Sequence, residues 1–258
     1  MTPYESFKQE SQDEIDGLGS DNELAGATRH WMNLANARKY SYHFEWLGRP
    51  IIQYPQDIVA LQEIIWSAQP DLIIETGIAH GGSLIFHASM LALLDVIDAE
   101  QAGSGAPAQP SRRVLGIDID IRAHNFEAIR AHPMARRIDM IQGSSTDASI
   151  VAQVVQRAQA AKRVLVCLDS NHTHEHVLSE LRAYAPLVSV GSYCVVMDTV
   201  IENLPKGSFP DRPWDHGNNP MTAVHAYLKE DTRFQIDSAV DSKILISVAP
   251  QGFLRRTF

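Results

Sequence analysis

The sequence predicts an α/β fold with a doubly wound, mostly parallel sheet of seven strands and a helical extension at the N-terminus. From residue 71 onward, short apolar runs alternate with helical patterns, as in a sheet that helices cover on both faces. Two further strand patterns follow five such runs. The 258 residues suffice for one such domain. We therefore divide the chain into an extension, residues 1–68, and a main domain, residues 69–258.

The expected elements follow from the apolar runs in chain order. Residues 1–25 are polar and acidic, and we expect them to be loose or only partly helical. Helices are expected at 26–39 and 55–67, on either side of an aromatic connection at 42–50. The five parallel strands are expected at 71–75, 113–118, 137–141, 163–169 and 192–198, with helices at 82–95, 121–131, 147–160 and 174–186. The remaining predictions are a Gly/Pro/Ala linker at 99–112, a loop at 203–220, a helix at 220–229 and strands at 232–238 and 242–248.

Composition excludes several classes of protein. An apolar content of 45% and a charged content of 21% are ordinary for a globular domain. The net charge of −9, with no basic stripe, argues against a nucleic-acid partner. Cys167 and Cys194 lie in apolar runs and are expected to be reduced core residues. No run approaches membrane-spanning length and no signal-peptide pattern is present, so we expect a cytoplasmic protein without a membrane partner.

The glycine-rich turn after the first parallel strand is the most informative segment, residues 71–83 (DLIIETGIAHGGS). A strand that turns through glycines into a helix brings backbone N–H groups and the positive end of a helix to the ligand-binding edge of a sheet. The spacing of Gly77 and Gly81 matches neither the dinucleotide motif nor the P-loop. The acid Glu75 before the first glycine suits a cationic or amino-acid-like ligand, as in the turn of S-adenosylmethionine (SAM) methyltransferases. The alternative is an ordinary strand-to-helix turn without a ligand.

Acids follow the other parallel strands. Asp118 is placed to accept the hydroxyls of a ribose, and the polar turn at Ser144 and Ser145 is placed to face an adenine. Asp169 and Asp198 end neighbouring strands, and carboxylates placed in this way suit Mg²⁺. The alternative for each acid is a helix cap.

A histidine cluster follows Asp169. His172, His174 and His176 suggest zinc, but their spacing departs from the His-x-His-x-Asp-His motif of metallo-β-lactamase-type hydrolases. An imidazole titrates near neutral pH, so His172 suits proton removal from a metal-bound hydroxyl. His174 and His176 are expected in the solvated first turn of a helix.

Taken together, these motifs resemble the cephalosporin hydroxylase-like family of methyltransferases, which includes rhamnosyl and macrolide-sugar O-methyltransferases. The resemblance covers roughly residues 28–250 and is most specific at 168–177. A terminal strand pair after five parallel strands also suits the Rossmann-like class I methyltransferase sheet. The resemblance implies a SAM cofactor, Mg²⁺ and a hydroxyl of a small molecule or sugar as acceptor, and it is compatible with a homo-oligomer. The residues implied for SAM are Glu75, Thr76, Gly77, Gly81, Gly82, Ser83, Asp118, Ser144, Ser145 and Asp169. Asp169 and Asp198 are implied as metal ligands, and His172 as the base.

One position departs from the family pattern. The family usually has Glu-Asp at the end of the fifth strand, and this chain has Met197-Asp198. A thioether is a poor ligand for Mg²⁺. The metal would therefore bind more weakly, use another ligand such as Glu202, or be absent. Two other functions stay open: a metal-dependent hydrolase that uses the histidine cluster, and a SAM-binding protein without catalysis.

The acceptor pocket has candidate walls in two aromatic segments. Trp46 and Trp214 offer flat faces of the kind that suit sugar rings, and Asn218 and Asn219 lie close to Trp214 in the sequence. The alternative for all four is simple loop packing.

Overall fold

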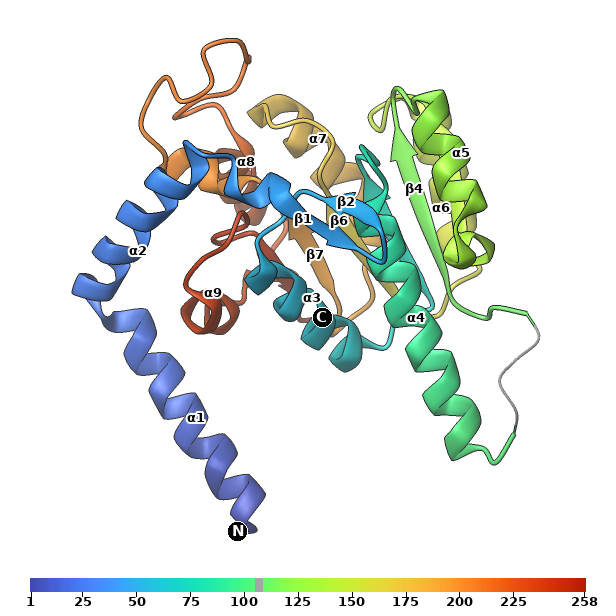
Figure 1. Cartoon of the computed structure of the whole chain (residues 1–258), viewed down its shortest axis with the longest axis horizontal. Coiled ribbons are helices and arrows are strands. Elements are labelled where there is room, and N and C mark those ends of the chain that lie inside the picture. The colour runs from blue at the N-terminus through green and yellow to red at the C-terminus, as the bar shows by residue number, and fades with distance from the viewer. Residues whose placement is uncertain (105–108) are drawn as a thin grey trace.

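A mixed sheet with helices on both faces forms the body of the computed structural model, which describes residues 1–104 and 109–258 (Figure 1). The strand order is β5-β4-β3-β6-β7-β9-β8; the first five strands in this order are parallel, and β9 pairs antiparallel with both β7 and β8. The strands are β3 (Leu72–Thr76), β4 (Arg113–Asp118), β5 (Ile138–Gln142), β6 (Val164–Leu168), β7 (Tyr193–Val196), β8 (Phe234–Ile236) and β9 (Phe253–Arg256). The predicted fold class and the five parallel strands are confirmed.

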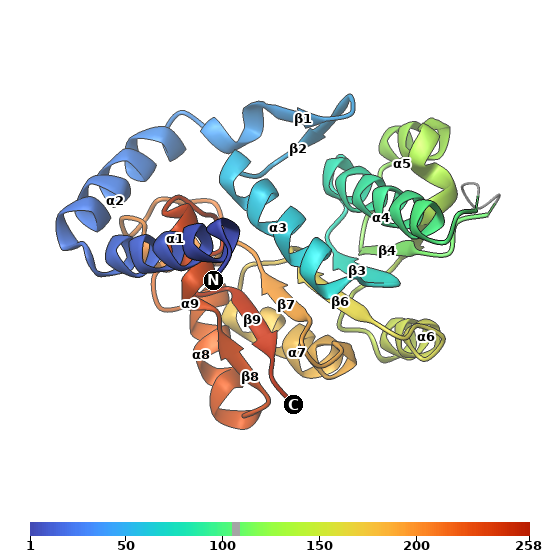
Figure 2. The ribbon, with the colours of Figure 1, turned by 90° about the horizontal axis from the view of Figure 1, so that it is seen from below.

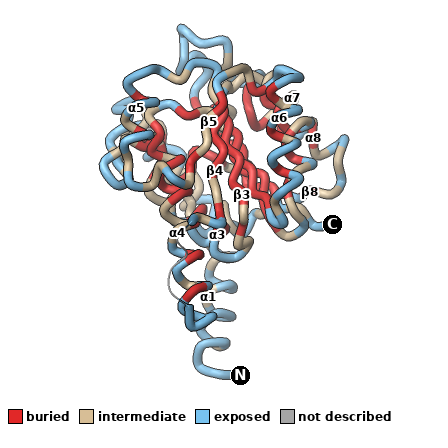
Figure 3. The backbone as a smooth tube through the Cα atoms, turned by 90° about the vertical axis from the view of Figure 1, so that its right-hand side faces the viewer, coloured by how far each residue is buried: buried red, intermediate tan, exposed pale blue. Residues whose placement is uncertain are grey.

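The helices cover the sheet in two layers (Figure 2). One layer holds α3 (Pro55–Ala68), α4 (Gly82–Gln101) and α5 (Ala123–Ala131), and the other holds α6 (Ala148–Ala158), α7 (His174–Tyr184) and α8 (Pro220–Glu230). Successive strand residues face opposite layers: Ile73 packs in the first apolar cluster and Ile74 in the second. Both faces of the central strands are therefore buried, as Figure 3 shows, and this explains their continuous apolar runs.

The first residues form helices, so the prediction of a loose segment over 1–25 is wrong. They belong to α1 (Pro3–Ser20) and α2 (Asn22–Asn36). Thr2 caps α1 by accepting the N–H of Glu5 at 3.2 Å, while the Glu5 carboxylate accepts the N–H of Thr2 at 2.6 Å. Asp21 caps α2 through the N–H of Leu24. Local capping thus compensates for a polar composition, and the N-terminal end of α1 extends away from the sheet (Figures 1 and 3).

The aromatic connection is a β-hairpin. After the 3₁₀ turn η1 (Tyr40–His43), β1 (Phe44–Trp46) pairs antiparallel with β2 (Arg49–Ile51). Trp46 donates its indole N–H to Ser89 of α4 at 3.0 Å. A Cβ at Gly82 would lie 2.2 Å from the Pro50 carbonyl oxygen. The hairpin therefore lies directly against the start of α4 and beside the glycine turn.

The C-terminal segment differs from the sequence prediction. Residues 242–248 do not form a strand, because α9 (Ser238–Ile244) occupies the first part of this range and β9 comes later, at 253–256. The carboxylate of buried Asp57 accepts the Ser247 hydroxyl at 2.6 Å and the Val248 N–H at 3.0 Å. These bonds hold the segment against α3 and remove it from the sheet.

The connection between α4 and β4 begins later than predicted, since α4 continues to Gln101. Arg112 closes it through ion pairs with Asp95 at 2.6 Å and Asp98 at 2.8 Å. The part of the predicted linker at 105–108 lies outside the described residues. In the described part of the chain, α4 is the one helix long and apolar enough to cross a membrane. However, 61% of its most apolar 18-residue stretch is buried in the structure, as in a core helix.

Candidate active site

The glycine turn joins β3 to α4 at the carboxyl end of the sheet. Gly77 and Gly81 have φ values of 89° and 82°, which glycine adopts without a steric penalty. A Cβ at Gly77 would lie 2.0 Å from the carbonyl oxygen of Asp169. The N–H of Asp169 in turn donates to the Thr76 carbonyl at 2.9 Å. The ends of β3 and β6 are therefore in direct contact, and only glycine fits at position 77.

Glu75 lies under this turn and is only 2% exposed. Its Oε1 accepts the Ser83 hydroxyl, and its Oε2 lies 3.4 Å from Nε2 of His87. Among the described residues, Oε2 has no hydrogen-bond partner, nor has Nδ1 of His87. Burial raises the pKa of Glu75 to about 8 and lowers the pKa of His87 to about 3. A buried carboxyl group with one unpartnered oxygen at this edge suits a cationic ligand, whose charge favours the ionised form.

His87 was missed by the sequence prediction. It follows Ser83 by one helical turn, so both side chains reach the same carboxylate. A polar residue within an otherwise apolar helical run was the available signal.

Asp118 ends β4, as predicted, and its carboxylate is already engaged with the turn. Oδ2 accepts the N–H of Ile78 at 2.8 Å and of Ala79 at 3.3 Å, and Oδ1 accepts the N–H of Asp120 at 2.9 Å. Each carboxylate oxygen has more than one acceptor site. Asp118 therefore shapes the turn, and its Oδ1 retains a site for a ribose hydroxyl.

The serine pair after β5 is divided between two roles. The Ser144 hydroxyl oxygen lies 3.1 Å from that of Thr146, and Ser144 stays partly exposed. The buried Ser145 places its hydroxyl 3.1 Å from Nε2 of His176, and its carbonyl accepts the hydroxyl of Tyr184. The Ser145 side chain is therefore committed to α7.

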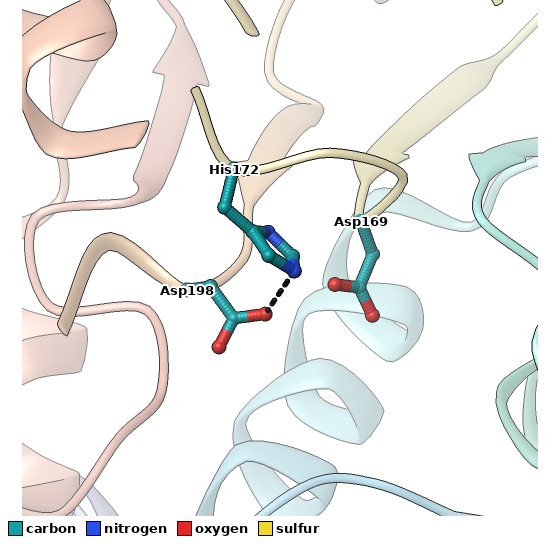
Figure 4. A group of neighbouring side chains, drawn as sticks. All are labelled: Asp169, His172 and Asp198. Atoms are coloured by element: carbon teal, nitrogen blue, oxygen red, sulfur yellow. Dashed lines mark ion pairs between the residues drawn. The ribbon is translucent and has the colours of Figure 1, made fainter. Parts of the chain in front are cut away.

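Asp169, His172 and Asp198 converge in front of the ends of β6 and β7 (Figure 4). One potential ligand atom from each lies within 4.8 Å of the others. Nε2 of His172 is 3.4 Å from Oδ2 of Asp198. Burial and the nearby Asp198 carboxylate raise the pKa of Asp169 well above its usual range. Two crowded carboxylates and an imidazole are a suitable donor set for a divalent cation.

Neither of the two neighbours considered as metal ligands supplies an oxygen to this group. Met197 is 2% exposed and packs in the apolar cluster that faces α3 and α4. Glu202 lies in the 3₁₀ turn η4 (Thr199–Asn203), where its Oε2 accepts the Gly217 N–H at 2.8 Å and the Asn219 amide. Its Oε1 is 3.3 Å from Nε2 of His216. Glu202 thus anchors the loop before α8 and does not belong to the metal group.

The other two histidines lie in the first turn of α7, as predicted, but they are only partly exposed and their side chains make contacts within the protein. Nδ1 of His174 lies 2.8 Å from the Thr222 hydroxyl of α8. His176 contacts Ser145 and Ser170 and lies 3.4 Å from Glu180. Both side chains pack α7 against its neighbours. Among the described residues, one group of three or more potential metal ligands converges, and it contains His172 but neither His174 nor His176. This geometry therefore does not support a zinc site built from the three histidines.

Of the predicted pocket walls, only Trp214 lies at the site. Its ring meets His172 edge-on, with centroids 4.6 Å apart, and the Arg212 guanidinium lies 5.3 Å from the Trp214 centroid. Trp46 packs on Phe86 of α4 instead. Asn218 accepts the His174 N–H, and Asn219 caps α8.

The fold and the site together define a class of enzyme. Five parallel strands with a terminal antiparallel pair, an acidic glycine turn and an acid after β4 are the features of a class I SAM-dependent methyltransferase. The chain belongs to the Rhamnosyl O-methyltransferase/CmcI family, whose model matches residues 38–257.

Named relatives agree with this assignment. Rhamnosyl O-methyltransferases of Mycobacterium tuberculosis and Mycobacterium bovis are 32% identical over 205 residues, which covers 78% of this chain and 73% of theirs. The rhamnosyl O-methyltransferase of Mycobacterium leprae is 28% identical over 215 residues, or 82% of each chain. The chain is therefore a SAM-dependent O-methyltransferase that acts on a small-molecule acceptor.

Solved structures support the fold. A CmcI structure with Mg and SAM superimposes with a TM-score of 0.53 at 18% identity, over 84% of this chain and 78% of that chain. The apo-structure of CmcI gives a TM-score of 0.52 at 18% identity, over 84% and 77%. At this identity the likeness concerns the fold alone.

Proposed function

We propose that this enzyme transfers the methyl group of SAM to a hydroxyl of a sugar, or of a natural product that carries one, with the assistance of Mg²⁺. The observation that carries the proposal is the Asp169–His172–Asp198 group beside the acidic glycine turn. The names of the mycobacterial relatives support a sugar acceptor, and the Mg and SAM of the CmcI structure support the cofactors.

The cofactor residues lie along one edge of the sheet. We propose that SAM is held by the glycine turn, by Asp118 and Asp169, and by the serine pair after β5. The turn residues are Glu75, Thr76, Gly77, Gly81, Gly82 and Ser83, and the serines are Ser144 and Ser145. The buried, unpartnered Oε2 of Glu75 fits a cationic ligand. The contact between the ends of β3 and β6 fixes the turn close to Asp169.

Asp169 and Asp198 would hold the metal, and their donor set fits it. Hard divalent cations take carboxylate oxygens and retain several waters, so two carboxylates suffice for a weak site. When bound, Mg²⁺ would lower the pKa of the acceptor hydroxyl and SAM would supply the methyl group. Met197 offers no oxygen, so we expect weaker metal binding than with a third carboxylate.

His172 is the proposed general base. Its Nε2 faces the Asp198 carboxylate at 3.4 Å, and Trp214 packs against the ring. Nε2 takes the proton of the acceptor hydroxyl, and Asp198 stabilises the resulting imidazolium. Trp214, which is half-buried, and Arg212, which is exposed, then border the acceptor.

Calorimetry with SAM, with and without Mg²⁺, tests the proposal, followed by methyl transfer to rhamnosyl glycosides. We expect the purified protein to bind SAM and to methylate a sugar hydroxyl faster with Mg²⁺. Bound zinc without SAM binding would favour a hydrolase, and SAM binding without transfer to any hydroxyl acceptor would favour a binding protein; either result overturns the proposal. A cytoplasmic location, a homo-oligomeric state and independence of nucleic acid and membranes stay predictions from the sequence.

A further inference from the structure

The backbone of the glycine turn is strained at a residue that is not glycine. Ala79 has a φ of 44°, in the left-handed region, between Gly77 and Gly81. A Cβ makes this conformation unfavourable, so it persists only where surrounding groups hold it in place. The residues that hold Ala79 therefore determine the shape that the turn presents to a ligand.

Three side chains hold the backbone on both sides of Ala79. Asp118 accepts its N–H at 3.3 Å, and Nδ2 of Asn125 donates to its carbonyl at 2.8 Å. Arg49 donates to the next carbonyl, that of His80, from Nε at 3.0 Å and from Nη2 at 2.5 Å. Nη2 of Arg49 also donates to Oδ1 of Asn125 at 3.1 Å. Arg49 and Asn125 thus form one connected clamp on the turn.

The two clamp residues come from segments outside the β3–α4 unit. Arg49 lies in the hairpin of the N-terminal extension, and Asn125 lies in the first turn of α5. The hairpin is itself fixed, because the ring of His132 lies 3.0 Å from the Leu47 carbonyl. Asn125 is only 3% exposed, so its hydrogen bonds are sheltered from water.

We propose that Arg49 and Asn125 are positioning residues that preorganise the glycine turn for SAM. This inference rests on the proposed function of the turn. Both residues bond to the backbone of the turn and act on the cofactor through it. A turn already held in its binding conformation does not have to be ordered when the ligand arrives. The ligand therefore binds more tightly, because no binding free energy is lost to ordering the turn.

The direct test compares SAM affinity by calorimetry in Asn125→Ala, Arg49→Lys and the wild-type protein. A lysine retains the charge but cannot make three hydrogen bonds from a planar fork. We expect SAM to bind about tenfold more weakly in each variant, the loss typical of a sheltered hydrogen bond. The KM for SAM should rise by a similar factor, while kcat at saturating SAM should change less than threefold. Arg182→Ala is the control. It also removes a paired arginine, whose Nη2 lies 2.7 Å from Oε1 of Glu230, but in the helix layer that holds α7 and α8.

A second test uses the strain itself. Glycine adopts a positive φ freely, so in an Ala79→Gly background the turn depends less on the clamp. We expect Asn125→Ala to weaken SAM binding clearly less in that background than in the wild type. If Asn125→Ala weakens SAM binding by the same factor in both backgrounds, the inference is overturned. This holds even if Asn125→Ala also lowers the thermal midpoint of the protein.

The failures of the two proposals are distinguishable. If wild-type protein binds SAM and both clamp variants bind it equally well, the clamp is wrong and the proposed function stands. If wild-type protein does not bind SAM, the proposed function fails and the clamp fails with it.

Discussion

Nε2 of His172 lies 3.4 Å from Oδ2 of Asp198, and the ring of Trp214 packs edge-on against the same imidazole. One residue follows β6, one follows β7 and the third precedes α8. An imidazole that contacts both a carboxylate and an aromatic ring has its orientation set before the acceptor binds. This arrangement makes the role of His172 open to a direct test.

Replacing His172 with Ala removes the proposed base without touching the glycine turn. We expect turnover to fall about 10²- to 10⁴-fold, the usual contribution of a general base, while the Kd for SAM stays unchanged by calorimetry. His30→Ala is the control, since His30 is exposed on α2. Turnover within threefold of wild type would remove His172 from the mechanism.

Replacing Met197 with Glu supplies the carboxylate that the family pattern contains. Position 197 is 2% exposed in an apolar cluster, and an unpaired buried carboxylate is costly. We expect the thermal midpoint to fall by several degrees without metal and to recover with Mg²⁺, because a ligand that binds only the folded state stabilises it. Met197→Leu, which conserves volume, should leave Mg²⁺ affinity as it is. Equal Mg²⁺ affinity in Met197→Glu and wild type would show that position 197 does not reach the metal.

The parallel sheet could be predicted because its signals are local. Each strand buried on both faces is a continuous apolar run, and each helix between strands has its own periodicity. The segment at 242–248 also resembles a strand, but its fate depends on Asp57, almost two hundred residues earlier. The prediction for α1 was wrong although its signal is local. The average polarity of the segment concealed the reciprocal capping of Thr2 and Glu5.

The site shows the same division. Parallel strand ends share one edge, so the order of strands is enough to bring Asp169 and Asp198 together. The partners of Glu202, His174 and His176 come from α8 or the loop before it and from the turn after β5. Spacing along the chain does not reveal those partners. The sequence therefore suggested Glu202 as a metal ligand and placed His174 and His176 in solvent.

Glu75→Gln should change how stability depends on pH. Burial raises the pKa of Glu75 from 4.5 to about 8, so between these values the unfolded chain has lost a proton that the folded protein keeps. The free energy of unfolding therefore falls as pH rises through this window. Gln keeps the shape and does not titrate, so its unfolding free energy relative to wild type should rise from pH 5 to pH 8. Urea denaturation without SAM measures it, with exposed Glu100→Gln as control. A difference that does not vary with pH would contradict the raised pKa.

Asp57→Ala tests the two hydrogen bonds that keep residues 242–248 out of the sheet. Asp57 is fully buried, and its carboxylate is the partner of the Ser247 hydroxyl and the Val248 N–H, both of them buried as well. Truncation leaves those two groups without their partner, and each buried unsatisfied group costs about 1–3 kcal/mol. We expect the free energy of unfolding in urea to fall by about 2–5 kcal/mol. Ser247→Ala removes two bonds, the one that its hydroxyl donates to Asp57 and the one that it accepts from the Ala249 N–H at 2.8 Å, but keeps the bond from the Val248 N–H. It should therefore cost less than Asp57→Ala, about 1–3 kcal/mol. If both variants unfolded like the wild type, the position of the C-terminal segment would have to be set by α9 and β9 alone.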